Sequence, residues 1–185
     1  MLDTINYWDG QALIKFQELA IRPELTPVMK ILSWMGNKGM IWILLILMLM
    51  CFKKTRHAAV LAAVALALSY CLNNLFLKEL VDRTRPYETW NQVQLLIGKQ
   101  HDPSFPSGHT ASSFAVATSL ALSFQRRWAG TLLILLAAAI AISRMYVGVH
   151  YPLDVLCGMV DAILIAHVVN YVDREHQEEL RPSKH

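Results

Sequence analysis

Residues 57–77 read HAAVLAAVALALSYCLNNLFL, an apolar run that leads directly into the charged stretch KELVDRTRP at residues 78–86. A helix needs about 20 residues to cross a hydrocarbon core about 30 Å thick, so this run has the length of a transmembrane helix. Three further runs share its length and apolar character: residues 105–124, 128–148 and 152–172. The sequence therefore predicts four transmembrane helices from residue 57 onward.

The composition of the whole chain also indicates a membrane protein. Of 185 residues, 55% are hydrophobic and only 17% are charged, and the mean hydropathy is +0.35. Soluble domains carry about 25% charged residues, so this composition argues against a soluble fold. No internal repeat or long linker divides the chain, and we expect a single domain over residues 1–185. Cys51, Cys71 and Cys157 are expected to be free thiols.

The first 52 residues follow a different pattern. The apolar run at residues 40–52 is short and reaches membrane length only by extending back through residues 36–38. Residues 1–35 alternate apolar and polar side chains and are interrupted by Pro23 and Pro27. This pattern indicates an interfacial amphipathic helix or a shallow hairpin.

The expected fold is an all-α polytopic membrane helix bundle of five to six transmembrane helices with an N-terminal amphipathic segment. The bundle takes residues 36–172, and residues 173–185 form a cytoplasmic tail. Basic residues gather in two connections and in the tail: Lys53, Lys54, Arg56, Arg126, Arg127, Arg174, Arg181 and Lys184. Since cytoplasmic loops are enriched in such residues, we expect them to face the cytoplasm. Residues 78–105 and 145–151 then face the opposite side.

Three short polar clusters fall on this non-cytoplasmic side. They are Lys78 with Arg85-Pro86, Pro106-Ser107-Gly108-His109, and Ser143-Arg144 with His150 and Asp154. Charged groups are costly at membrane helix ends and usually serve a function there. The clusters offer three basic groups for a phosphate, together with two imidazoles and a carboxylate suited to a nucleophile, a proton donor and an orienting group. They indicate phosphoryl transfer on a lipid.

The second cluster has the features of a helix start that binds an anion. Ser107 is a good N-cap residue, and the first turn from Gly108 has free N–H groups at the positive end of the helix dipole. The alternative is that Ser107 only caps the helix and His109 only lies at the lipid interface.

The third cluster suggests a histidine held by a carboxylate. Pro152 suits the first position of the last helix and puts Asp154 at the third. From there the carboxylate can reach back to His150 and hold one ring nitrogen, so that the other nitrogen faces the phosphate. The alternative is a surface histidine beside an aspartate that offsets the helix dipole. For Lys78 and Arg85 the alternative is snorkelling to the lipid headgroups.

Together the clusters resemble the signature of the type 2 phosphatidic acid phosphatase superfamily, which includes membrane lipid phosphatases and, distantly, vanadium haloperoxidases. All three signature blocks match, and the surrounding helices are similar to those of small bacterial undecaprenyl-diphosphatases and phosphatidylglycerophosphatases. The resemblance implies that His150 is the nucleophile, His109 the general acid and Asp154 the group that orients His150. It also implies five ligands of the phosphoryl oxygens: Lys78, Arg85, Ser107, Gly108 and Arg144.

The resulting hypothesis is a metal-independent lipid phosphatase or diphosphatase without a cofactor. Apart from residues 78–105, no non-cytoplasmic connection is long enough to read a headgroup, so recognition should rest on the phosphate and the lipid tail. Among the substrates that the resemblance to the small bacterial members implies, undecaprenyl diphosphate fits this best and is the expected substrate. Phosphatidylglycerol phosphate and phosphatidic acid are the alternatives. The expected partners are the lipid phosphate and the membrane, with no nucleic acid, and the sequence does not indicate the oligomeric state. A small transporter, whose charges would line a path through the membrane, and a non-catalytic assembly protein are the rival classes.

Overall fold

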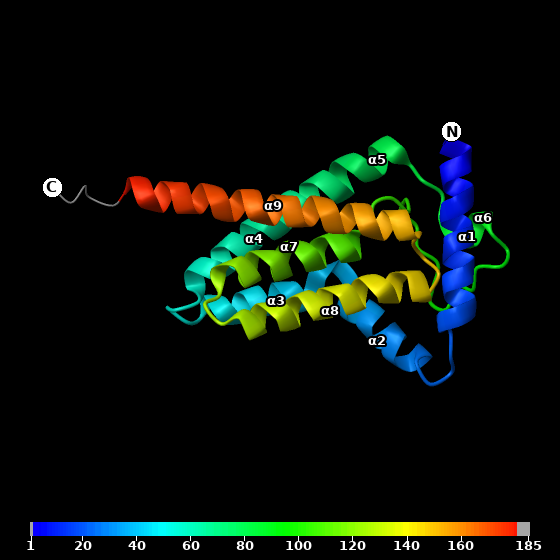
Figure 1. Cartoon of the computed structure of the whole chain (residues 1–185), viewed down its shortest axis with the longest axis horizontal. Coiled ribbons are helices and arrows are strands. Elements are labelled where there is room, and N and C mark those ends of the chain that lie inside the picture. Colours follow the sequence, from blue (N-terminus) through cyan, green and yellow to red (C-terminus); the bar gives the residue numbers. More distant parts are fainter. Residues whose placement is uncertain (1, 181–185) are drawn as a thin grey trace.

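The computed structural model describes residues 2–180, and all regular secondary structure in this range is helical, which confirms the predicted all-α class. The elements are α1 (Leu2–Ala20), α2 (Thr26–Met35), the 3-10 helix η1 (Asn37–Gly39), α3 (Met40–Met50), α4 (Arg56–Tyr70), the π-helix η2 (Cys71–Leu77), α5 (Lys78–Val81), α6 (Pro86–Thr89), α7 (Gly108–Ser123), α8 (Arg127–Tyr146) and α9 (Pro152–Glu179). Figure 1 shows α3, α4, α7, α8 and α9 running lengthwise through one bundle.

Helix α7 lies inside the bundle and packs against α4, α8 and α9. Its buried positions include the small residues Ala111, Ala115 and Ala117. Small side chains let membrane helices approach closely. Gly158 of α9 has the same role, because an added Cβ there would lie 2.9 Å from the carbonyl oxygen of Ser107. The start of α7 is therefore held directly against α9.

Within residues 2–180, three helical stretches are long and apolar enough to cross a membrane: Arg56–Thr89, Arg127–Tyr146 and Pro152–Glu179. Helices α2 and α3, which are bent by 51° at η1, add a fourth if they form one broken span. Helix α7 has 16 residues, or about 24 Å at about 1.5 Å per residue. It is short because the chain is still extended at Ser107. The predicted five to six spans are therefore not confirmed.

The break between α2 and α3 has a local backbone cause. Lys38 has a φ of 53° and Gly39 a φ of +68°, and both values lie in the left-handed region that ends a right-handed helix. The apolar run at residues 40–52 therefore does not continue straight back through residues 36–38. The break turns α2 toward the end of the bundle where α1 lies (Figure 1).

The N-terminal segment forms two helices, and Pro23 lies in the turn between them. Figure 1 shows α1 crossing the end of the bundle, roughly perpendicular to the long helices. Leu13 and Ile14 of α1 are buried, whereas Trp8 is 66% and Leu19 is 70% exposed. This arrangement suits a helix in the membrane interface, which stays a prediction.

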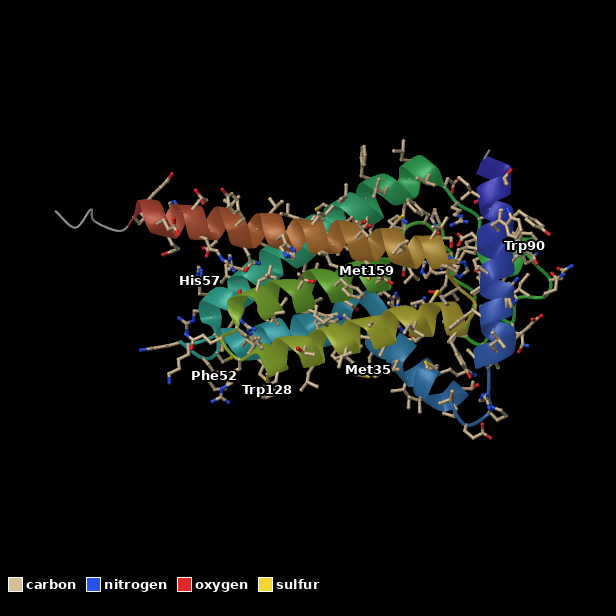
Figure 2. The ribbon with its side chains drawn as sticks, in the orientation of Figure 1. Met35, Phe52, His57, Trp90, Trp128 and Met159 are labelled. Atoms are coloured by element: carbon tan, nitrogen blue, oxygen red, sulfur yellow. The ribbon has the colours of Figure 1, made fainter. Side chains whose placement is uncertain are left out.

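The α3–α4 and α7–α8 connections lie at the end of the bundle away from α1. Figure 2 labels three residues at this opposite end: Phe52, His57 and Trp128. Helix α9 extends past this end, and its Asp173 pairs with His57 at 2.9 Å. The predicted tail is thus helical as far as Glu179. Arg181 and Lys184, which contributed to the predicted orientation, lie outside the described residues.

Candidate active site

The structure brings the three polar clusters together at the α1 end of the bundle. Lys78 begins α5, Arg85 directly precedes α6, and Arg144 lies in the last turn of α8. His150 lies in the α8–α9 connection, and Asp154 lies in the first turn of α9. All five residues are 6% exposed or less. Because burying an ion costs several kcal/mol unless it is compensated, such a concentration is typical of a functional site.

Lys78 and Arg85 converge on the carboxylate of Asp102. Arg85 Nη2 lies 2.7 Å from Asp102 Oδ1, and Lys78 Nζ bonds to Asp102 Oδ2. Burial raises the pKa of Asp102, but the hydrogen bond from Lys78 and the charges of Lys78 and Arg85 outweigh it and lower the pKa to about 2. The ionised carboxylate of Asp102 therefore lies between Lys78 and Arg85, where a phosphate was expected to bind.

Arg85 also makes two hydrogen bonds that fix its guanidinium. Its Nε donates to the carbonyl oxygen of Asp102 at 2.9 Å, and its Nη1 donates to the carbonyl oxygen of Val149 at 2.8 Å. The second bond places Nη1 3.4 Å from His150 Nε2. Nε2 of the imidazole thus lies next to the guanidinium of Arg85.

His150 is buried and has no hydrogen bond at Nδ1. That nitrogen lies 3.5 Å from Asp154 Oδ2, adjacent but beyond ordinary hydrogen-bond length. Burial lowers the pKa of His150 well below its usual value, and the charges of Arg85 and Arg144 lower it further. The imidazole is therefore neutral at physiological pH, which is the form that a nucleophile requires.

Asp154 sits at the third position of α9, as predicted, and its carboxylate reaches back to the backbone. Its Oδ2 accepts the N–H of Tyr151 at 2.9 Å, which completes a capping box. Two side chains that the sequence analysis did not assign to Asp154 also donate to it: Ser104 Oγ to Oδ2 and Arg83 Nη1 to Oδ1, both at 2.5 Å. The sequence indicates only weakly that Arg83 belongs to the site, because Arg83 is one of several charged residues within residues 78–86.

The broken α2–α3 segment brings two further polar residues to the site. Asn37 Oδ1 lies 2.9 Å from His109 Nε2, and Ser33 Oγ bonds to Arg144 Nη1. Gly36 is required between them, because an added Cβ would lie 2.7 Å from His109 Cδ2. Neither Ser33 nor Asn37 was predicted, since Ser33 belongs to the segment read as amphipathic and Asn37 to residues 36–38, which were read only as an extension of the apolar run. Arg144 Nε is buried and makes no hydrogen bond.

Ser107 occupies the N-cap position of α7, but its hydroxyl does not cap the helix. It accepts a hydrogen bond from Thr110 Oγ1 at 3.0 Å instead. The expected side-chain cap is therefore absent at Ser107, and no cap competes with an anion for the first N–H groups of α7. Gly108 permits close packing here, because an added Cβ would lie 2.8 Å from Asn74 Oδ1 of the π-helix η2.

Within the described residues, no three His, Cys, Asp or Glu side chains are grouped so that they could hold a metal ion. Metal independence stays a prediction, and so does the absence of a cofactor.

Asp161, which lies two turns after Asp154, accepts a hydrogen bond from Asn73 Nδ2 at 3.1 Å and so links α9 to η2.

A buried histidine and buried cations at one end of an apolar helical bundle are the arrangement that the sequence predicts for a membrane phosphatase. The chain belongs to the PAP2 superfamily, which matches residues 58–178, and the predicted resemblance is thereby confirmed. An undecaprenyl-diphosphatase of Sulfolobus acidocaldarius is 33% identical over 146 residues, which cover 79% of this chain and 68% of that protein. Several other curated relatives are matched over only about half of their own length.

Two solved structures are similar along most of the chain. The crystal structure of Aquifex aeolicus LpxE has a TM-score of 0.78 and 28% identity, and the match covers 87% of this chain and 94% of that one. The first transmembrane PAP2 type phosphatidylglycerolphosphate phosphatase from Bacillus subtilis has a TM-score of 0.78 and 25% identity. That match covers 98% of this chain and 90% of the other. The family and these relatives identify the chain as a membrane phosphatase.

Proposed function

We propose that this protein hydrolyses a lipid phosphate or diphosphate through a phosphohistidine at His150. The observation that carries the proposal is a buried imidazole whose Nε2 lies 3.4 Å from Arg85 Nη1. Burial and the charges of Arg85, Arg144 and Lys78 lower its pKa, which favours the neutral form. A phosphoryl group bound by these cations would lie within reach of that nitrogen.

In the first half-reaction, Nε2 of His150 attacks phosphorus, and the bond from phosphorus to the leaving oxygen breaks. His109 donates a proton to that oxygen. The phosphorylated imidazole carries positive charge, and the adjacent carboxylate of Asp154 stabilises it through Nδ1–H. We expect the 3.5 Å separation of Nδ1 and Oδ2 to shorten to hydrogen-bond length at this stage.

In the second half-reaction, a water molecule gives a proton to His109 and attacks phosphorus. The N–P bond breaks, and inorganic phosphate leaves. Charge develops on the equatorial oxygens in both steps, where Lys78, Arg85, Arg144 and the N–H groups at the start of α7 can stabilise it. Fixed cations of this kind supply the stabilisation that a magnesium ion gives in other phosphoryl transferases, which supports metal independence.

The site is proposed to face the non-cytoplasmic side of the inner membrane. The basic α3–α4 and α7–α8 connections lie at the opposite end of the bundle, where Lys53 and Arg126 are exposed. On a chain whose three native cysteines are replaced by serine, cysteines introduced at Glu88 or Gln100 should react with an impermeant thiol reagent in intact cells. A cysteine at Gln125 should not react, and the reverse pattern would contradict this orientation.

Undecaprenyl diphosphate is the proposed substrate, and undecaprenyl phosphate is the product. The undecaprenyl-diphosphatase relative supports this choice, as does the shortness of the α8–α9 connection, residues 147–151, which leaves little chain to read a headgroup. Phosphatidylglycerol phosphate is the second candidate, because the Bacillus subtilis phosphatase named for it is similar over 98% of this chain. Phosphatidic acid presents the same monoester chemistry.

The test is phosphate release by the purified protein in mixed micelles, with the three lipids compared side by side. We expect the highest kcat/KM for undecaprenyl diphosphate and no turnover by His150→Ala. A higher kcat/KM for phosphatidylglycerol phosphate would show that the proposed substrate is wrong, and it would leave the proposed mechanism unchanged. Full activity of a folded His150→Ala variant would refute the mechanism. His167→Ala is a matched control, because His167 lies in α9 away from the site and its ring bonds within its own helix.

A further inference from the structure

The carboxylate of Asp154 is held on both oxygens. Oδ2 accepts from Tyr151 N–H and Ser104 Oγ, and it is the oxygen next to His150 Nδ1. Oδ1 accepts from Arg83 Nη1 at 2.5 Å. Because Arg83 holds the oxygen that is not directed at the histidine, it restricts rotation of the carboxylate and keeps Oδ2 toward His150.

Arg83 is in turn held by helix α1. Its Nη2 donates to Asp9 Oδ2 at 2.7 Å and to Asn6 Oδ1 at 2.9 Å. Its guanidinium carbon also lies 3.9 Å from the centre of the Tyr151 ring, within cation–π range. The side chains of Arg83, Asp9 and Asp154 are 12%, 2% and 0% exposed, so the two ion pairs that Arg83 makes are little screened by water.

Asp9 makes a second contact with the same helix start. Its Oδ1 accepts the N–H of Leu153, in the first turn of α9, at 3.0 Å. The carboxylate of Asp9 is therefore linked to Asp154 by two routes. One runs through the side chain of Arg83, and the other runs through the backbone N–H of Leu153, which directly precedes Asp154. Asp9 lies outside the family match at residues 58–178, so α1 contributes to the site from a part of the chain that the match does not cover.

We propose that Asp9 and Arg83 are positioning residues for the nucleophile, so that docking of α1 sets the orientation of His150 through Asp154. The inference rests on the proposed role of His150. Neither residue contacts the cationic centre formed by Lys78, Arg85 and Arg144. Their loss should therefore impair the chemical step and leave substrate binding intact.

The test compares Arg83→Gln, Asp9→Asn and the double variant in steady-state assays on the full chain. Loss of a residue that orients such a group typically costs about 10- to 100-fold. We expect kcat to fall by about that factor, with KM within about threefold of the wild type. The double variant should lose little more than Arg83→Gln alone, because both substitutions break one chain of contacts. Arg83→Lys should recover part of kcat, since it restores the charge.

Arg56→Gln and Asp173→Asn are the matched controls, because they remove the same charge types at the far end of the bundle and should leave kcat unchanged. A wild-type kcat in folded Arg83→Gln and Asp9→Asn would overturn the inference. A rise in KM at constant kcat would also overturn it, because Arg83 would then bind substrate. If Arg83→Gln does not yield folded protein, Arg83→Lys and Asp9→Asn decide by the same criteria.

Failure of the inference can be distinguished from failure of the proposed function. If His150→Ala is inactive while Arg83→Gln and Asp9→Asn have the kcat of the wild type, the role of His150 as nucleophile is supported and only the positioning role is refuted. If folded His150→Ala is active, the proposed function itself falls.

Discussion

The two ends of the bundle carry the same kinds of charged residue in different surroundings. At the α1 end, Lys78, Arg85 and Arg144 are buried around a carboxylate and a histidine. At the far end, Lys53 and Arg126 are exposed. Exposed charges are solvated and screened, whereas buried ones act strongly on any group between them. Residue type alone does not separate anchoring charges from catalytic ones; burial and convergence do.

Histidine substitutions should show the largest contrast between the ends. We expect His109→Ala to lower kcat/KM on a lipid phosphate, which reports on the first half-reaction, by about 100- to 10,000-fold, the usual contribution of a general acid. The loss of kcat/KM should be much smaller with p-nitrophenyl phosphate, whose leaving group needs no proton. His57→Ala, at the exposed end, should be neutral. Equal losses on both substrates would contradict the proton-donor role of His109.

Arginine substitutions should give the next largest contrast. Arg85→Gln removes a buried cation that we propose binds the phosphoryl group, and we expect kcat/KM to fall by about 100- to 1,000-fold. Arg126→Gln should remain within about twofold, as expected for an exposed charge. The assay is phosphate release at matched detergent and lipid concentrations. Similar effects of the two substitutions would show that charge near the membrane, and not the site, controls the rate.

The pH dependence of kcat/KM should reflect the buried surroundings of His150. Burial and the charges of Arg85, Arg144 and Lys78 lower its pKa, Asp102 opposes them, and Asp154 lies beside Nδ1. Protonation removes the nucleophile, so activity should be lost only as pH falls well below the ordinary histidine pKa of about 6.5. In Arg85→Gln the acid limb should move to higher pH. An acid limb at or above pH 6.5 in the wild type would contradict this environment.

The smallest expected effect is at Asp102, whose carboxylate occupies the position between Lys78 and Arg85. A bound phosphate must displace it. Asp102→Asn should therefore strengthen inhibition by inorganic phosphate and by vanadate several-fold, seen as a lower inhibition constant. Asp173→Asn, which removes a carboxylate at the far end, is the control. Weaker inhibition of Asp102→Asn would mean that the carboxylate helps to hold the anion.

Much of the site could be predicted because its residues lie in short blocks at the ends of apolar runs. The placement of Asp154 in the first turn of α9 followed from Pro152 alone. Arg83, Asp9 and Ser33 could not be assigned in this way, since their partners are 71, 144 and 111 residues away in the chain. Such contacts depend on how helices pack, which local pattern does not determine.

The number of spans was less predictable than the helical class. Apolar length suggested a full crossing at residues 105–124, but the extended backbone at Ser107 shortens α7 to 16 residues. The left-handed backbone at Lys38 and Gly39 was also not evident, and it divides α2 from α3. Both departures place polar groups at the site, where local function outweighs the regular membrane-helix pattern.

The most direct test of the account is to trap the phosphoryl group on the enzyme. Labelled lipid phosphate would be mixed with the protein, and the reaction would be quenched within milliseconds in alkali, in which phosphohistidine is stable. The modified peptide would then be mapped by mass spectrometry. The account predicts a phosphoryl group on His150 in the wild type and none in His150→Ala. Turnover without any phosphorylated residue, or with the label elsewhere, would contradict it.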